Sequence, residues 1–253
     1  MNKNLEFLKK INRRKFLRVL LGIIAASIAS FLYAFQKHFK QEAFNEKALI
    51  NQVKPLEKPF LTGFMSVEEA IAKRRSIRDY SKDPLTFQEL SQLLWAAQGI
   101  TDLKTGFRAA PSAGATYPLE VYVVIGSEGV SGLEAGIYHY NPLTNELKLI
   151  VKGDFRNELS SAALGQRWVK TAPINIVLTA VYERTTRVYG DRGIRYVHME
   201  VGHVSENIYL QATALGLGTV AVGAFNDELV QKILNLPKER KPLYIMPVGR
   251  KLK

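Results

Sequence analysis

The spacing of apolar positions predicts regular structure over residues 66–253. Apolar residues recur at helical intervals in five segments, 67–75, 86–99, 154–164, 195–215 and 226–234. Runs typical of strands occupy 119–126, 136–141, 146–152, 174–182, 218–224 and 243–248. This order of elements predicts an α+β or mixed α/β fold, in which helices wrap a sheet that the segment 243–248 completes.

Local signals fix several boundaries of these elements. The stretches Ser66–Glu69 and Thr86–Glu89 both have the form of a capping box, which predicts a helix start at each. Residues 141–145 read as the turn of a hairpin between the second and third strands. The run 174–182 is almost continuously apolar, which predicts a strand buried on both faces.

The N-terminus has the pattern of an export signal or a membrane anchor. Residues 1–18 hold seven bases and one acid, and the apolar run 19–35 would span about 25 Å as a helix. The pair Arg13-Arg14 resembles a twin-arginine signal, and Ser27 with Ala29 offers a cleavage site. We expect residues 1–35 to be a cleaved signal or an uncleaved anchor, residues 36–65 a linker or arm, and the body to be exported.

Composition narrows the classes of function. The chain has 253 residues, of which 47% are hydrophobic, and it contains no cysteine. A disulfide scaffold, an iron–sulfur cluster and a cysteine nucleophile are therefore excluded. The net charge is +12, but half of it lies in residues 1–18. The mildly basic body suits a small anionic ligand better than nucleic acid.

Two segments carry candidate binding groups. Lys73–Arg78 presents guanidinium groups and a serine hydroxyl, a donor set that matches phosphate oxygens. The alternative is a solvated basic helix end. Arg108–Ala115 is rich in small residues, so its backbone could approach a flat ligand, although a tight loop before a strand explains it equally well.

Other patterns exclude common sites. Residues 215–219 follow a long helix and lack the third glycine of a dinucleotide fingerprint. His198, Glu200 and His203 do not have the spacing of a helical zinc site, so no metal is expected. Neither a carboxylate pair nor a Ser–His–Asp set can be assembled. Arg250, after the last strand, could reach the same anion as Arg74.

Five segments in order give the chain a resemblance to a known family. They are Ala72–Arg78, Pro111–Pro118, Arg195–His203, Ala214–Thr219 and Pro247–Arg250. This set resembles the nitroreductase family of FMN enzymes, specifically its SagB-type dehydrogenase branch, over residues 66–251. The resemblance implies an α+β fold with a mixed sheet wrapped by helices. It also implies an intertwined homodimer with one FMN at each end of the subunit interface.

The resemblance also implies the site. The cofactor-binding residues would be Arg74, Arg75, Ser76, Arg78, Pro111, Ser112, Ala113, Gly114, Gln166, Gly223 and Arg250. The first four would meet the phosphate, the ribityl chain and the N1/O2 edge, and Arg250 would complete the phosphate site. Pro111–Gly114 would line the isoalloxazine from the partner subunit. Gly223 would lie near N5, and Gln166 near the pyrimidine edge.

The implied activity is ping-pong hydride transfer through flavin N5, with a small-molecule or peptide substrate. Azoline-oxidising members of the branch carry Lys-Tyr where this chain has Arg195-Tyr196, and arginine is a poor base. Peptide azoline oxidation is therefore an alternative, with Tyr196 as a proton donor, and a non-catalytic flavin or anion-binding module is another. NAD(P)H would serve as the reductant in the cytoplasm, whereas an exported enzyme would need another donor.

Overall fold

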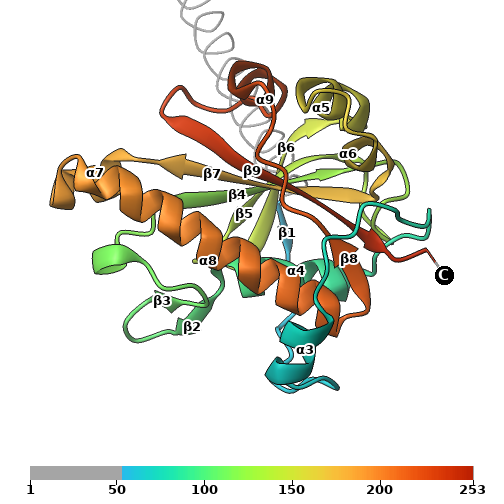
Figure 1. Cartoon of the computed structure of the whole chain (residues 1–253), viewed down its shortest axis with the longest axis horizontal. Helices are drawn as coiled ribbons and strands as arrows, with labels where there is room; N and C mark the ends of the chain where they lie inside the picture. The colour runs from blue at the N-terminus through green and yellow to red at the C-terminus, as the bar shows by residue number, and fades with distance from the viewer. Residues whose placement is uncertain (1–52, 253) are drawn as a thin grey trace, which may run out of the picture. The chain divides into compact units, whose positions relative to one another are not determined.

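A seven-stranded sheet with the order β1-β6-β5-β4-β7-β9-β8 forms the centre of the molecule (Figure 1). The structure is a computed structural model, and it describes residues 53–252. The strands are β1 (Val53–Pro55), β4 (Leu119–Ile125), β5 (Gly136–Asn141), β6 (Glu146–Lys152), β7 (Ile174–Val181), β8 (Leu217–Thr219) and β9 (Arg240–Arg250). A separate hairpin is formed by β2 (Ile100–Asp102) and β3 (Phe107–Arg108).

Every pairing between the seven strands of the sheet is antiparallel. A parallel neighbour enters at the edge of the sheet, where Ser76 forms a bridge with Thr219 of β8. The predicted mixed sheet is therefore mixed only through this bridge. The strand β9 lies between β7 and β8, so the edge of the sheet is β8 rather than the last strand.

Helices cover both faces of the sheet. They are α3 (Val67–Lys73), α4 (Phe87–Gln98), α5 (Arg156–Ala162), α6 (Arg167–Thr171), α7 (Glu183–Tyr189), α8 (Arg192–Ala214) and α9 (Asp227–Ile233), with a short 3₁₀ turn, η1 (Ala113–Ala115). The apolar faces of α4 and α8 pack on one side of the sheet, and those of α5, α6 and α9 pack on the other; Figure 1 shows the two groups of helices on either side of the strands. Because side chains alternate along a strand, β4 sends Val121 and Val123 to the first core and Tyr122 and Val124 to the second.

The centre of the sheet matches the sequence prediction. Seven of the eight residues of β7 are buried, since β4 and β9 flank the strand and helices cover both faces. The hairpin of β5 and β6 has the predicted bounds. Thr86 and Glu89 form the complete capping box of α4. At Ser66 only half of the box is present, because Glu69 pairs with Lys73.

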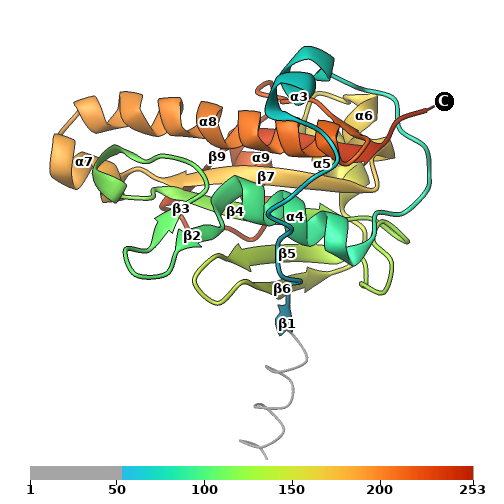
Figure 2. The same cartoon turned by 90° about the horizontal axis from the view of Figure 1, so that it is seen from below.

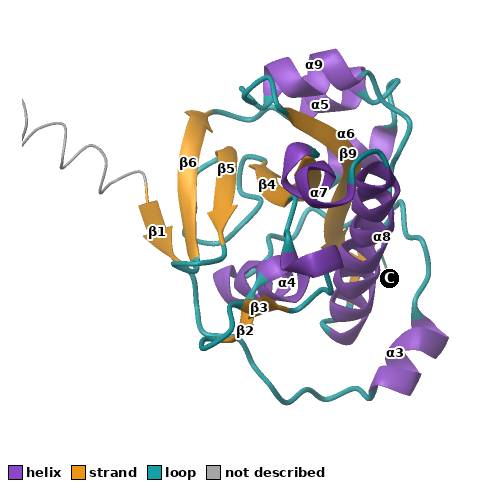
Figure 3. Cartoon of the chain, turned by 90° about the vertical axis from the view of Figure 1, so that its left-hand side faces the viewer, coloured by secondary structure: helices purple, strands orange, loops and turns teal. Residues whose placement is uncertain are grey.

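Several boundaries differ from the prediction. Helix α8 begins about one turn early, at Arg192, and β9 extends from Arg240 to Arg250. The predicted strand 218–224 ends at Thr219, and only Val222 pairs again, with Ile245. Residues 53–55, which lie in the predicted arm, form β1 and pair with β6. Figure 3 shows the described part of the chain as three layers, with helices on both sides of the strands.

The predicted signal or anchor, residues 1–35, lies outside the described residues, as does most of the predicted arm. Among the helices of residues 53–252, none is both long enough and apolar enough to cross a membrane.

Candidate functional site

The segment 74–78, which we call the arginine segment, lies beside the end of the sheet. Ile77 donates a backbone hydrogen bond to the carbonyl of Thr219 (2.9 Å). Three residues further on, Tyr80 bridges Lys251, and Ser81 donates to the carbonyl of Arg250 (2.9 Å). Backbone pairing therefore places the arginine segment and the end of β9 side by side.

The phenol of Tyr209, on α8, organises the arginine segment. Its hydroxyl lies 3.1 Å from the hydroxyl of Ser76 and accepts a hydrogen bond from the backbone N–H of Ala221 (2.8 Å). The guanidinium of Arg74 lies over the Tyr209 ring, 5.2 Å from its centroid, and 3.9 Å from a carboxylate oxygen of Glu206. Tyr209 thus joins the arginine segment to the chain that leads into Gly223.

The other arginines of the segment remain accessible. Arg75 donates to the carbonyls of Ala72 (3.0 Å) and Arg74 (2.6 Å). Arg78 lies over the ring of Trp168, 5.4 Å from its centroid. Among the described residues, neither Arg75 nor Arg78 forms an ion pair. Their charges are available to an anionic ligand.

The guanidinium of Arg250 has a carboxylate partner. It donates to both carboxylate oxygens of Glu89 (3.1 and 2.9 Å), on α4. Glu89 also accepts from the N–H of Thr86 as part of the α4 cap. The backbone of Arg250 is close to the arginine segment, but its guanidinium would have to leave or share Glu89 to reach a phosphate there.

Gln166 and Gly223 are brought together with this end of the molecule. Gln166 precedes α6 and donates its side-chain amide to the carbonyl of Ala224 (2.9 Å). A Cβ on Gly223 would lie 3.4 Å from the ring of Tyr244. We call the arginine segment, Gln166, Gly223 and Arg250 the arginine half of the site.

The small-residue loop, residues 111–117, is tightly folded. Gly114 has φ 59°, and a Cβ built on it would lie 2.6 Å from the hydroxyl of Tyr189. Both the backbone conformation and the contact favour glycine, although Ala115 (φ 52°) and Tyr117 (φ 43°) adopt a positive φ in the same loop. Ser112 accepts a hydrogen bond from the N–H of Tyr117 (2.9 Å), which closes the loop.

Hydrogen bonds from helix α7 hold the small-residue loop in place. The hydroxyls of Thr116 and Thr185 lie 2.8 Å apart, and Arg184 donates to the carbonyl of Tyr117 (2.9 Å). Arg184 also pairs with Glu120, whose other oxygen lies 2.6 Å from His139 Nε2. Burial alone would raise the pKa of Glu120, but His139 and Arg184 outweigh it and lower the pKa to about 2. Glu120 is therefore a fixed negative charge that anchors α7.

Tyr196 lies beside the small-residue loop. Its ring packs edge-on against that of Tyr189 (5.1 Å between centroids), and the Tyr189 hydroxyl in turn touches Gly114. The loop residues Pro111, Ser112, Ala113 and Gly114 and the predicted proton donor Tyr196 are thus brought together by α7. We call these five residues, with Tyr189, the loop half of the site.

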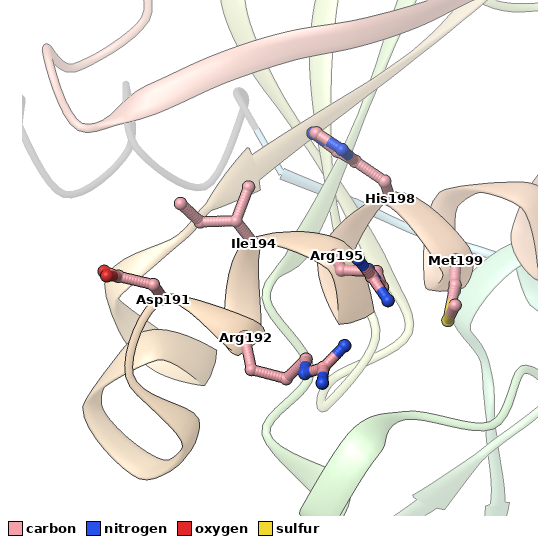
Figure 4. A pocket seen from close by; sticks show the side chains of 6 residues that line it. All are labelled: Asp191, Arg192, Ile194, Arg195, His198 and Met199. Carbon is pink, nitrogen blue, oxygen red and sulfur yellow. The ribbon is translucent and has the colours of Figure 1, made fainter.

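The first turns of α8 line a shallow hollow next to the loop half (Figure 4). Arg192, Arg195 and Met199 project to one side of the helix, and Ile194 and His198 to the other. This split follows from helical geometry, since residues three and four apart share a face. His198 Nε2 lies 2.6 Å from the hydroxyl of Tyr182 at the end of β7.

One buried acid on α8 was considered from the sequence only as a metal ligand. Glu200, on α8, is 3% exposed. Burial raises its pKa to about 7, against the effects of Ser112, Gln98 and Arg108. The described residues contain no group of three or more His, Asp or Glu side chains that could hold a metal. Because its pKa is raised to about 7, Glu200 is a buried group that can titrate near neutral pH.

The two halves lie at opposite ends of α8. Glu200, near the loop half, and Tyr209, in the arginine half, are about 14 Å apart along the helix axis. Figures 1 and 2 both show α7 at one end of α8 and α3 at the other. Within this chain, the residues predicted for a single cofactor are divided between two places.

Sequence reasoning missed the residues that organise each half. Tyr209 and Tyr189 sit in helices as ordinary amphipathic aromatics, and Glu89 reads only as a cap. Glu120 follows a buried leucine in β4 and looks like a solvent-facing strand residue. Each owes its role to contacts between segments far apart in sequence, so no local signal identified it.

Comparisons with known proteins match this chain to one family. The model of the Nitroreductase family matches residues 71–250. A protein of Methanocaldococcus jannaschii named as a candidate nitroreductase is 53% identical over 188 residues, which are 74% of this chain and 92% of that protein. The crystal structure of a candidate nitroreductase from Ralstonia eutropha JMP134 superposes with a TM-score of 0.70 at 28% identity, covering 80% of this chain and 90% of that one.

A third relative has a more specific name. The microcin B17-processing protein McbC of Escherichia coli is 30% identical over 172 residues, which are 66% of this chain and 63% of that protein. The family match covers both halves of the site, from Arg74 to Arg250. The chain therefore belongs to the nitroreductase family, whose members are FMN-dependent oxidoreductases, and is an enzyme of that class.

Proposed function

We propose that this chain binds FMN through its arginine half and uses it to transfer hydride to or from a small-molecule or peptide substrate. The observation that carries this proposal is the pairing of the arginine segment with the ends of β8 and β9, beside Tyr209. Three guanidinium groups and a hydroxyl gather there around the edge of the sheet, and this donor set matches a phosphate.

The residues present fit the cofactor. Arg75 and Arg78 have no carboxylate partner among residues 53–252, and the side chain of Arg74 is one-third exposed. In the loop half, the small residues Pro111, Gly114 and Ala115 are exposed, although the Tyr189 hydroxyl fills the space beside the Cα of Gly114. A flat ring could lie against such a backbone. Arg250 would add its charge by exchanging Glu89 for the phosphate.

A homodimer would bring the two halves into one site. Members of the family are commonly homodimers. Large apolar side chains are exposed near the arginine half and near the loop half; they are Phe60, Leu61, Phe64, Val67 and Ile71, and Val188, Ile194 and Met199. Such surfaces are typical of protein interfaces. We infer that the loop half of one subunit meets the arginine half of the other.

When bound, FMN supplies a hydride acceptor and donor at N5, which serves two substrates in turn. The chain supplies charge and position. Arg78 and its neighbours would stabilise negative charge at the N1/O2 edge, and Arg74, with Ser76, would hold the phosphate. Tyr196, beside the loop, would supply a proton where a substrate needs one.

Peptide azoline oxidation is the second candidate, because McbC is among the relatives. The position next to Tyr196 holds Arg195, and arginine is a poor base. Of the two readings, a general FMN oxidoreductase agrees better with this residue. If bound FMN is never reduced, the chain is a flavin or anion carrier without catalytic turnover.

We also propose that residues 1–35 direct the chain out of the cytoplasm, as a twin-arginine-like signal or an anchor. The basic run 1–18 and the apolar run 19–35 support this. Mutating Arg13 and Arg14 together to lysine should leave the chain inside the cytoplasm, as protease treatment of whole cells and spheroplasts would show. Equal protease sensitivity of the wild type and the double variant would contradict the twin-arginine signal.

The direct test of FMN binding uses absorption and titration of the full chain. We expect flavin absorption to remain with the purified protein after excess FMN is removed. Arg74→Ala should raise the Kd for FMN about 10- to 150-fold, equivalent to about 1.5–3 kcal/mol. Lys148→Ala, which removes an exposed charge on β6 at the far side of the sheet, is the control and should leave the Kd unchanged. Equal affinity of all three proteins would contradict the proposal.

A further inference from the structure

The outer face of α8 is left uncovered by the described part of the chain. We give this name to Arg195, Met199, Gly202 and Glu206, which fall within about 60° of one another around the helix axis. All four residues are exposed, and Figure 4 shows Arg195 and Met199 projecting to the same side of the helix. The outer face runs from the loop half of the site toward the arginine half.

Gly202 is a glycine in the interior of a 23-residue helix. Glycine is less favourable than alanine at such a position, so its presence needs a reason. Its φ is not positive, and a Cβ built on it would meet nothing within 4 Å among the described residues. Neither the backbone nor the packing of residues 53–252 therefore requires glycine here. A second helix, however, can approach a glycine more closely than a larger residue.

The division of the site along α8 constrains how two copies of the chain can pack. If the loop half of each copy meets the arginine half of the other, the two α8 helices run antiparallel across a two-fold axis. Tyr196, in the loop half, then lies opposite Tyr209, in the arginine half, and the axis passes midway between them. That midpoint lies between Gly202 and His203. The helices would therefore cross at the one glycine of the outer face.

The charges of the outer face favour the same arrangement. In the antiparallel register Met199 lies opposite Glu206, and Arg195 lies about one turn further on, about 6 Å along the axis. Among the described residues Arg195 forms no ion pair, and the nearest cation to Glu206 is Arg74, at 3.9 Å. Antiparallel helices would bring Arg195 of each copy near Glu206 of the other, whereas parallel helices would bring like charges together.

We propose that the outer face of α8 binds a second copy of this chain, with the two helices antiparallel and crossing at Gly202. Arg195 of each copy pairs with Glu206 of the other and is a positioning residue. This pairing draws the Glu206 carboxylate away from Arg74, which leaves the Arg74 guanidinium to an anionic ligand. The arrangement rests on the proposed function, in which the two halves form one site across the interface.

Cross-linking through introduced cysteines tests the register. The chain has no cysteine of its own, so a disulfide can form only at the introduced positions. Full-length Gly202→Cys should form a disulfide-linked dimer on mild oxidation, because the two residues meet at the axis. A mixture of Met199→Cys and Glu206→Cys should form a disulfide between the two kinds of subunit. Glu158→Cys, exposed on α5 on the other side of the sheet, is the control and should stay unlinked.

Exchange of charges tests the ion pair. Arg195→Glu or Glu206→Arg alone should raise the dimer dissociation constant about tenfold, because like charges then meet twice in each dimer. The double variant, Arg195→Glu with Glu206→Arg, should return to within about threefold of the wild type. Glu158→Arg is the control and should leave the constant unchanged. Sedimentation equilibrium of the full chain without FMN measures all four proteins against the wild type.

The outcomes separate this proposal from the proposed function. A monomeric chain, a dimer without the cross-links at 202 and between 199 and 206, or a double variant as weak as the single variants would each overturn the crossing of α8. FMN binding by such a protein would leave the proposed function in place. Cross-links and restored dimerisation in a protein that does not bind FMN would support the crossing and contradict the proposed function.

Discussion

The two halves of the site are built in opposite ways. The loop half is tied internally by hydrogen bonds from Ser112, Thr116 and Arg184, and it has the fixed charge of Glu120 behind it. The arginine half keeps its backbone in register with β8 but leaves Arg75 and Arg78 accessible. The loop half therefore has a backbone held by hydrogen bonds, and the arginine half keeps accessible positive charges. Variants in the first should therefore change stability, and variants in the second should change binding.

The largest loss of stability is expected from a substitution at Gly114. Gly114→Ala would force a Cβ into the Tyr189 hydroxyl and also a side chain into a left-handed conformation. We expect a loss of about 2–4 kcal/mol in the free energy of unfolding, measured with urea. Gly132→Ala is the matched control, because Gly132 has φ +74° and nothing nearby, so it should lose only about 1 kcal/mol. Equal losses would show that the contact with Tyr189 carries no weight.

The next largest effect is a pair of opposite dependences of stability on pH, which arise from Glu120 and Glu200. The pKa of Glu120 is lowered to about 2, so its contribution to stability is complete above pH 4.5 and is lost as the pH falls toward 2. The pKa of Glu200 is raised to about 7, so stability declines as the pH rises from 4.5 to 7. Each change is about 3 kcal/mol.

These slopes are separated by comparing variants in urea at each pH. Relative to the wild type, Glu120→Gln should lose its disadvantage near pH 2, and Glu200→Gln should gain stability above pH 7. If both variants run parallel to the wild type over the whole range, the two carboxyls do not titrate as their surroundings require.

A smaller effect is expected at Tyr209, the organiser of the arginine half. Tyr209→Phe keeps the ring beneath Arg74 but removes the hydroxyl that contacts Ser76 and accepts from Ala221. Leaving that N–H unpaired should lower stability by about 1–2 kcal/mol and weaken FMN binding. Tyr244→Phe, with no side-chain hydrogen bond among the described residues, should change neither. An unchanged Tyr209→Phe protein would mean that the hydroxyl does not order this half.

The smallest effect on stability should come from Arg74. It is partly exposed, and its nearest carboxylate, on Glu206, is 3.9 Å away. Arg74→Ala should change the free energy of unfolding by less than about 0.5 kcal/mol while it weakens FMN binding. A large loss of stability would place Arg74 among structural residues and would remove the contrast between the halves.

Elements with a clear local pattern of apolar and polar residues were predicted from the sequence. Features that depend on contacts between distant segments were missed. The buried run of β7, the hairpin of β5 and β6 and the cap at Thr86 were all found, because each follows from local patterning. Helix α7 was missed because its two threonines and a valine weaken the helical signal over seven residues. Its importance comes from packing on the loop, which no local pattern encodes.

The candidate residues were likewise grouped by family resemblance rather than by geometry. That resemblance named the arginine segment and the loop, but it could not show that they lie at opposite ends of α8. Nor could it show that Arg250 is bound by Glu89 or that Glu200 is almost completely buried. These facts follow from tertiary contacts across more than a hundred positions, such as that of Ser76 with Tyr209.

Mixed dimers test most directly whether one site takes its halves from two subunits. Arg74→Ala disables the arginine half and Gly114→Trp the loop half, so neither protein should bind FMN tightly by itself. If the halves meet across the interface, a dimer with one subunit of each kind keeps one intact site. It should bind one FMN per dimer with wild-type affinity. Mixed dimers that bind no better than the two parent proteins would contradict a site shared between subunits.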